Sequence, residues 1–145
     1  MCGIVGYIGP KPARDIVING LKRLEYRGYD SAGIAIFNKE PNVFKCKGRV
    51  RDLEELVNKT NIDGNIAMGH TRWATHGEPN EINAHPQISY KGNFVVVHNG
   101  IIENYARIKK HLESRGVKFS SQTDTEVLAS LIEHLYLEGD LSAEQ

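Results

Sequence analysis

The sequence predicts an α+β fold in which a mostly antiparallel sheet lies beside helices. Short apolar runs with the length of strands are clustered, and segments with helical periodicity accompany them. The chain has 145 residues, of which 40% are hydrophobic and 25% are charged, as in an ordinary globular domain. We therefore expect one domain with a buried core.

Charge and cysteine content exclude several classes of protein. Lysine plus arginine and aspartate plus glutamate both total 18, so nucleic-acid binding through broad positive charge is not expected. No apolar run approaches the roughly 20 residues of a membrane span, and the N-terminus lacks the basic region of a secretory signal. Cys2 and Cys46 form neither a disulfide framework nor a metal-binding pair, which indicates a reduced, cytoplasmic protein.

The N-terminal segment predicts a strand followed by a helix. Residues 3–8 form a short apolar run that we expect to be a buried strand, ended by Gly9 and Pro10. Residues 13–24 show helical periodicity. The expected inward face of this helix carries Ile16, Val17, Leu21 and Leu24.

The next segment predicts a loop, two strands and a second helix. Residues 25–33 are polar and rich in glycine, as in a loop. Strands are expected at 32–37 and 43–47, with a turn around Pro41 and Asn42. The following helix, at 52–59, should direct Leu53, Leu56 and Val57 inward.

The middle of the chain contains two further strand candidates. Residues 66–71 predict one strand, which leads into a long stretch without periodicity at 72–86. Residues 94–98 predict another, which stops at Asn99 and Gly100.

Two helices are expected after this strand. The first covers 105–115 and is closed by Gly116. The second begins at a sequence with the spacing of a capping box, with Thr123 at the cap and Glu126 three residues later. Its expected apolar face carries Val127, Leu128, Leu131, Ile132 and Leu135.

Cys2 is the first candidate for chemistry. Met1 precedes a small residue, so its removal would leave a thiol and a free α-amino group on one residue. The amine has a reference pKa of about 7.7–8.0 and can accept the proton of the thiol near neutral pH. The alternative is a small buried cysteine at the start of a strand.

Asn99 and Gly100 form the second candidate. An Asn-Gly pair after a strand is typical of a turn. The same pair offers a side-chain amide and an unhindered backbone N–H, and two such donors can stabilise an oxyanion.

Arg72 and Asp124 form the third candidate. A guanidinium can bind a carboxylate through two parallel hydrogen bonds, and Arg72 lies in an irregular loop after a strand. Together the two residues could hold the charged ends of an amino acid. Asp124 also has a structural interpretation, because the helix dipole favours a carboxylate in a first turn.

The histidines suggest a metal site only weakly. His70, His76, His85 and His98 lack the HExxH arrangement, and no cysteine lies nearby in sequence. Histidines that serve as hydrogen-bonding groups are the favoured interpretation, so neither a metal ion nor a cofactor is expected.

Five segments resemble the class II glutamine amidotransferase family. The opening MCGIVGYIG is shared among several of its enzymes. Longer segments resemble the branch that aminates fructose-6-phosphate: RLEYRGYDSAGIA at 23–35, HTRWATHGEPNEINAHP at 70–86, VVVHNGIIENY at 95–105 and SQTDTEV at 121–127.

The resemblance implies an N-terminal-nucleophile hydrolase fold, a four-layer sandwich with two antiparallel sheets between helical layers. It implies that Cys2 is the nucleophile, that Asn99 and Gly100 form the oxyanion hole, and that Arg72 and Asp124 bind the α-carboxylate and α-ammonium of glutamine. Further residues of the same pocket are then Trp73, Thr75 and His76, with Arg27 and His85 near it in less defined roles.

The resemblance also implies that residues 1–145 are the N-terminal part of a longer glutaminase domain. The rest of that domain, and a sugar-phosphate isomerase-type domain that uses the ammonia, would lie elsewhere in a parent enzyme that is expected to be a homo-oligomer. L-glutamine is the expected ligand, and fructose-6-phosphate is expected only in the parent. The alternatives are a glutamine-binding module without turnover and a structural fragment.

Overall fold

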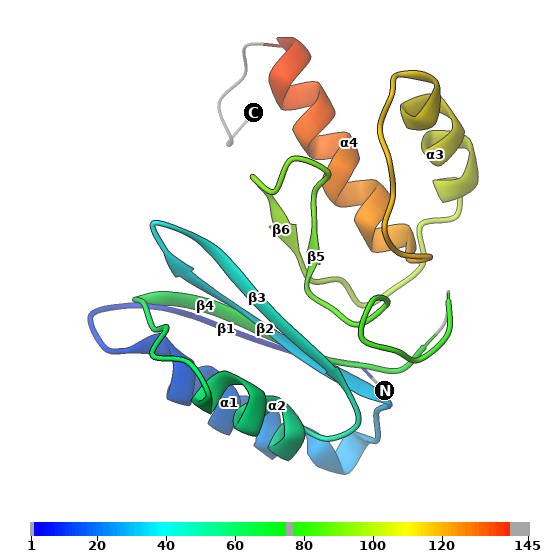
Figure 1. Ribbon diagram of the computed structural model, residues 1–145. Coiled ribbons are helices and arrows are strands. Elements are labelled where there is room, and N and C mark those ends of the chain that lie inside the picture. Colours follow the sequence, from blue (N-terminus) through cyan, green and yellow to red (C-terminus); the bar gives the residue numbers. More distant parts are fainter. Residues whose placement is uncertain (1, 75–76, 140–145) are drawn as a thin grey trace.

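The computed structural model describes residues 2–74 and 77–139. Figure 1 shows four layers: α1 and α2 lie on one side of a four-stranded sheet, while β5 and β6 lie on its other side with α3 and α4 beyond them. Both sheets are antiparallel. The predicted α+β class with antiparallel sheets is therefore confirmed.

The larger sheet has the strand order β1-β4-β2-β3. Its strands are β1 (Gly3–Ile8), β2 (Ser31–Asn38), β3 (Glu40–Lys47) and β4 (Ile66–Arg72). Four of the predicted strands are thus confirmed. The expectation that the first is buried was wrong, because exposure alternates along β1.

Two helices cover one face of this sheet (Figure 1). They are α1 (Ala13–Arg23) and α2 (Val50–Asn58), close to the predicted ranges. The first core of the protein fills the space between sheet and helices, and its fully buried members include Val17, Leu21, Ile34, Ile36, Val50 and Leu53. Ile16, expected on the inward face, is exposed.

The second half contains a short hairpin and two helices. The hairpin pairs β5 (Gln87–Ile88) with β6 (Val95–Val96), so β5 was missed and β6 is shorter than predicted. The helices are α3 (Tyr105–Ser114) and α4 (Asp124–Gly139). A second, smaller core lies here and includes Leu112, Val117 and Val127.

The turn between β2 and β3 lies at Lys39, not around Pro41 and Asn42 as predicted. Asn38 pairs with Glu40, and Lys39 adopts a φ of 65°. Pro41 lies within β3, which is an edge strand, and an edge position tolerates the missing N–H of proline. The side chain of Asn42 donates to the carbonyl of Ile36 across the hairpin at 3.3 Å.

The predicted inward face of α4 was partly wrong. Ile132 and Leu135 are 38% and 50% exposed, whereas Glu133 is fully buried. The Glu133 carboxylate accepts hydrogen bonds from the backbone N–H groups of Lys91, at 2.7 Å, and Asn93, at 3.3 Å. The helix therefore turns a carboxylate towards the β5–β6 hairpin because the hairpin loop has backbone donors to satisfy.

The start of α4 confirms half of the predicted capping box. Thr123 Oγ1 accepts a hydrogen bond from the backbone N–H of Glu126 at 3.2 Å. The Glu126 carboxylate does not return to Thr123, as a reciprocal box requires, but accepts from the N–H groups of Ser120 and Ser121 at 3.0 and 2.7 Å. The side chain therefore orders the segment before the helix.

Gly33 allows a loop of the second half to lie directly on the larger sheet. A Cβ atom at this position would overlap the backbone carbonyl of His85. Only a residue without a side chain permits this approach, which carries His85 over β2. Gly33 thus helps to set the distance between the two halves of the molecule.

We expect Gly33→Ala to destabilise the protein by about 1–3 kcal/mol or more, because the added methyl group has to displace backbone. Gly6→Ala is the matched control, since a Cβ on this exposed glycine of β1 meets nothing within 4 Å. The control should stay within about 0.5 kcal/mol of the unchanged protein. Urea unfolding followed by circular dichroism measures both changes, and equal stabilities would contradict this role of Gly33.

Candidate active site

The pairing of β1 with β4 brings Cys2 to the end of β4. Gly3 lies opposite Thr71, and the N–H of Gly3 donates to Thr71 Oγ1 at 3.1 Å. Cys2 therefore lies beside the chain that leaves β4. The N–H of Trp73 donates to Cys2 Sγ at 3.1 Å, and this contact holds the sulfur in place.

The segment after β6 contributes Asn99 and Gly100. Asn99 Nδ2 donates to the backbone carbonyl of Cys2 at 3.3 Å, while Asn99 Oδ1 lies 2.7 Å from His70 Nε2. Gly100 has a φ of 156°, and a Cβ there would approach the ring of His98 within 3.1 Å. The Asn-Gly pair is thus held against Cys2 and does not connect two paired strands.

Arg72 is a buried cation, only 3% exposed. Its Nη1 donates to the carbonyl of Glu78 at 3.3 Å. Burial lowers the pKa of Arg72, whereas the charges of Asp30, Cys2 and Asp124 act in the opposite direction. A desolvated guanidinium beside a cavity is well suited to bind an anion.

Asp30 fixes the segment that carries Arg72. The backbone N–H of Asp30 donates to the carbonyl of Arg72 at 2.8 Å. One of its carboxylate oxygens accepts from the N–H of Ala74, also at 2.8 Å. The irregular chain after β4 is therefore held on both sides of Trp73.

Asp124 faces the same region from the first turn of α4. It is 4% exposed, and its Oδ2 accepts from the N–H of Ile102 at 2.7 Å. The carboxylate thus ties the segment after Asn99 to α4. It does not cap its own helix, since Thr123 has that role.

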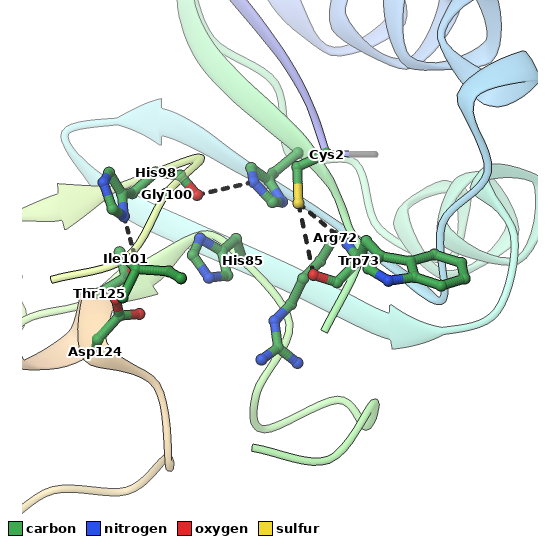
Figure 2. A pocket seen from close by; sticks show the side chains of 10 residues that line it. Cys2, Arg72, Trp73, His85, His98, Gly100, Ile101, Asp124 and Thr125 are labelled. Atoms are coloured by element: carbon green, nitrogen blue, oxygen red, sulfur yellow. Dashed lines mark hydrogen bonds between the residues drawn. The ribbon is translucent and has the colours of Figure 1, made fainter. Parts of the chain in front are cut away.

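Several of these residues line a cavity of about 220 Å³ (Figure 2). Its lining comes from both halves of the molecule, and residues expected at the site make up most of it: Cys2, Arg72, Trp73, His85, Gly100 and Asp124. The sequence had not assigned a site role to the other lining residues, which are His70, His98, Ile101 and Thr125. His98 and Thr125 are the sequence neighbours of Asn99 and Asp124, and this adjacency could have indicated that they lie at the site.

His70 and His85 lie under this cavity as a stacked pair, with ring centroids 4.4 Å apart. Burial lowers the pKa of His70 to about 4 and, together with neighbouring positive charges, that of His85 to about 2. Both rings are therefore neutral near pH 7, and Arg72 supplies the fixed positive charge beside the cavity.

Four predicted residues do not join the described lining, and one of them is Asn99, which is exposed and contacts the Cys2 carbonyl. Arg27 is exposed and lies over the ring of Tyr26, with 5.9 Å from its Cζ to the ring centroid. Thr75 and His76 lie outside the described residues.

The second thiol is in a different environment. Cys46 is 7% exposed within β3, and burial raises the pKa of its thiol to about 11. It therefore forms little thiolate near neutral pH. Of the two cysteines, only Cys2 lies in the cavity wall.

Two further observations concern metals and membranes. Among residues 2–74 and 77–139, no three histidine, cysteine, aspartate or glutamate side chains are grouped so that they could hold a metal ion. No helix in the same ranges is long and apolar enough to cross a membrane.

Comparisons with known proteins agree on one family. The family model described as a glutamine amidotransferase domain matches residues 47–139. The glutamine–fructose-6-phosphate aminotransferase (isomerizing) of Caldanaerobacter subterraneus is 59% identical over 142 residues, 97% of this chain and 23% of the relative. That of Pyrococcus horikoshii is 59% identical over 136 residues, 92% of this chain and 22% of the relative. The chain thus spans less than a quarter of these relatives.

Solved structures give the same result. The glutamine phosphoribosylpyrophosphate amidotransferase from B. subtilis, complexed with ADP and GMP, superposes with a TM-score of 0.80 at 29% identity. A structure described as the allosteric regulatory enzyme of purine biosynthesis gives a TM-score of 0.82, also at 29% identity. Each likeness covers 99% of this chain and 31% of the other. The expected N-terminal-nucleophile hydrolase fold is thereby confirmed.

Proposed function

This chain belongs to the glutamine amidotransferase family, and on that basis we propose that it hydrolyses the side-chain amide of L-glutamine, with Cys2 as the nucleophile. One observation carries the proposal: a thiol, a buried cation and a buried carboxylate line a single cavity, and the side-chain amide of Asn99 donates to the backbone of the residue that carries the thiol. The thiol can perform the chemistry, and the charged pair can hold an amino acid.

The reaction begins with attack of the Cys2 thiolate on the side-chain carbonyl carbon of glutamine. The C–N bond then breaks, and the nitrogen leaves as ammonia with a proton from the α-amino group of Cys2, which removal of Met1 would expose. Water hydrolyses the resulting γ-glutamyl thioester to glutamate and restores the thiol. The Trp73 N–H, 3.1 Å from Sγ, holds the sulfur in place for the attack.

The oxyanion of each tetrahedral intermediate is assigned to Asn99 and Gly100. Asn99 Nδ2 already lies 3.3 Å from the carbonyl oxygen of Cys2, on the side of the nucleophile. Gly100 follows directly, and its backbone is unhindered because it has no side chain. A side-chain amide and a backbone N–H are the kinds of donor that stabilise such an oxyanion.

Arg72 and Asp124 are assigned to the two charged groups of the amino acid. The guanidinium would bind the α-carboxylate, and the carboxylate would bind the α-ammonium. The N–H of Ile102 donates to one carboxylate oxygen of Asp124, Oδ2, so the other oxygen, Oδ1, can accept from the ligand. With both ends held, asparagine would place its amide one methylene short of the thiol.

The remaining assignments extend this pocket. Trp73, more than half exposed at 55%, would cover the bound ligand, and Thr75 and His76 would complete the wall. His85 lines the cavity. Arg27 does not line it, so any effect of Arg27 on the site would be indirect.

We propose that the ammonia serves amination of fructose-6-phosphate to glucosamine-6-phosphate. The names of the relatives support this acceptor, and the part that binds it would lie outside the quarter of their length that the chain matches. We further propose that the chain is the N-terminal part of a glutaminase domain within a cytoplasmic homo-oligomer.

Cys2→Ala in the full-length protein should abolish glutamine hydrolysis while glutamine still binds, because the thiol forms the covalent bond and the charged pair supplies affinity. Steady-state ammonia release and calorimetric binding measure the two effects. Cys46→Ser is the control and should keep near-normal turnover, since its thiol is buried in β3. Substantial hydrolysis by Cys2→Ala would remove Cys2 from the mechanism.

Each charged anchor should contribute roughly ten- to hundredfold to glutamine affinity, as charged hydrogen bonds do. Arg72→Lys should weaken binding because an ammonium cannot form the planar two-bond contact. Asp124→Asn removes the charge but keeps an oxygen that can accept from Ile102 N–H, so the adjoining segment should stay in place. Calorimetry gives both affinities, and an unchanged affinity would reduce that residue to a structural role.

Asn99→Ala and Asn99→Asp should lower kcat by about a hundred- to thousandfold, with little change in the affinity for glutamine. The donor acts only as charge develops on the attacked oxygen, and a carboxylate would oppose that charge. Steady-state kinetics, with circular dichroism to check folding, distinguish this role from a turn. A folded Asn99→Asp protein with normal turnover would return Asn99 to a turn residue.

A further inference from the structure

His70 is a buried histidine to which the proposed mechanism assigns no step. It lies in β4, opposite Gly33 of β2, and is fully buried beneath the cavity. Its Nε2 lies 2.7 Å from Asn99 Oδ1 and 3.3 Å from the backbone carbonyl oxygen of His98. It therefore contacts the segment that carries the expected oxyanion donor.

The contacts of His70 determine which ring nitrogen carries the proton. A carbonyl oxygen can only accept a hydrogen bond, so the contact with the backbone carbonyl of His98 requires a hydrogen on His70 Nε2. The second neighbour of this N–H must then also be an acceptor, which is Asn99 Oδ1. Nδ1 consequently carries the lone pair, and no partner for it occurs in the part of the chain that the structure describes.

This tautomer fixes the orientation of the Asn99 amide. With Oδ1 towards His70, Nδ2 faces Cys2 and donates to its carbonyl at 3.3 Å. A flipped amide would set its NH2 against the Nε2–H of His70 and its oxygen against the Cys2 carbonyl. Both contacts would be repulsive, so the His70 donor and the Cys2 acceptor select the same orientation.

The surroundings keep the ring in place and neutral. His85 stacks on it at 4.4 Å between centroids, with 20° between the planes. Burial lowers the pKa of His70 to about 4, so the ring stays neutral near pH 7. A buried Nδ1 without a partner costs stability. The contact of the other ring nitrogen, Nε2, with Asn99 explains why a histidine is present here despite this cost.

We propose that His70 is a positioning residue, which holds the side-chain amide of Asn99 with its N–H donors directed towards the oxygen of the attacked amide. The proposal rests on the proposed function and adds a requirement to it. Preorganised donors lower a barrier because they need no reorientation during the reaction. Without His70, the Asn99 amide can turn its oxygen towards the developing negative charge.

Two polar variants separate this role from packing. Glutamine at position 70 can place an amide N–H near the position of Nε2, whereas asparagine is one methylene shorter and cannot reach Asn99. In the full-length protein we expect His70→Asn to lower kcat about ten- to hundredfold, with KM for glutamine nearly unchanged. This loss is smaller than the loss expected when the Asn99 donor itself is removed. His70→Gln should recover most of the rate.

The same pair of variants in the Asn99→Ala background completes the test. There is then no amide to orient, so His70→Asn should lower kcat no further. If it lowers kcat by the same factor in both backgrounds, His70 supports the fold and the proposal is overturned. If His70→Asn does not fold, His70→Gln decides: near-normal kcat supports the role, and an equal loss in both backgrounds overturns it.

The same variants also separate the role of His70 from the oxyanion role of Asn99. A folded Asn99→Ala protein with normal turnover would overturn the oxyanion assignment, and with it any role for His70 through Asn99. A large loss in Asn99→Ala, together with an additive effect of His70→Asn, would leave the oxyanion assignment intact and overturn the role of His70 alone.

Discussion

The antiparallel register of β1 and β4 is the constraint on which the candidate site depends. Gly3 lies opposite Thr71, so residues at the start of the chain and some seventy positions later share one end of the sheet. The ladder hydrogen bonds thereby set Cys2 against the backbone of Trp73 and near the buried Arg72. A reactive group beside the chain terminus is held by strand pairing, which is more rigid than a free end.

Polar contacts join the second half of the molecule to this sheet. Asn99 spans the junction, since its amide contacts His70 of β4 and the carbonyl of Cys2. Gly33 lets the backbone of His85 lie directly on β2, which brings a stacked pair of neutral histidines under the cavity. These directional hydrogen bonds and this close backbone approach together give the groups around the cavity defined orientations.

Residue pattern predicted the larger sheet and its helices well, because these elements bury a continuous apolar core. It failed where buried polar groups decide the structure. Glu133 is buried to satisfy the β5–β6 hairpin, so Leu135 points outward against its hydropathy. Most of the site followed from residue type and the family resemblance. The role of His70 did not, because it depends on a tautomer that only the arrangement of acceptors in space determines.

To test directly whether Cys2 forms a covalent intermediate with glutamine, the full-length protein is quenched with acid during turnover and its peptides are mapped by mass spectrometry. We expect a γ-glutamyl adduct on the N-terminal peptide, on Cys2 and not on Cys46, and that peptide should begin at Cys2 with a free amine. An adduct on Cys46, or turnover by protein that retains Met1, would contradict this expectation.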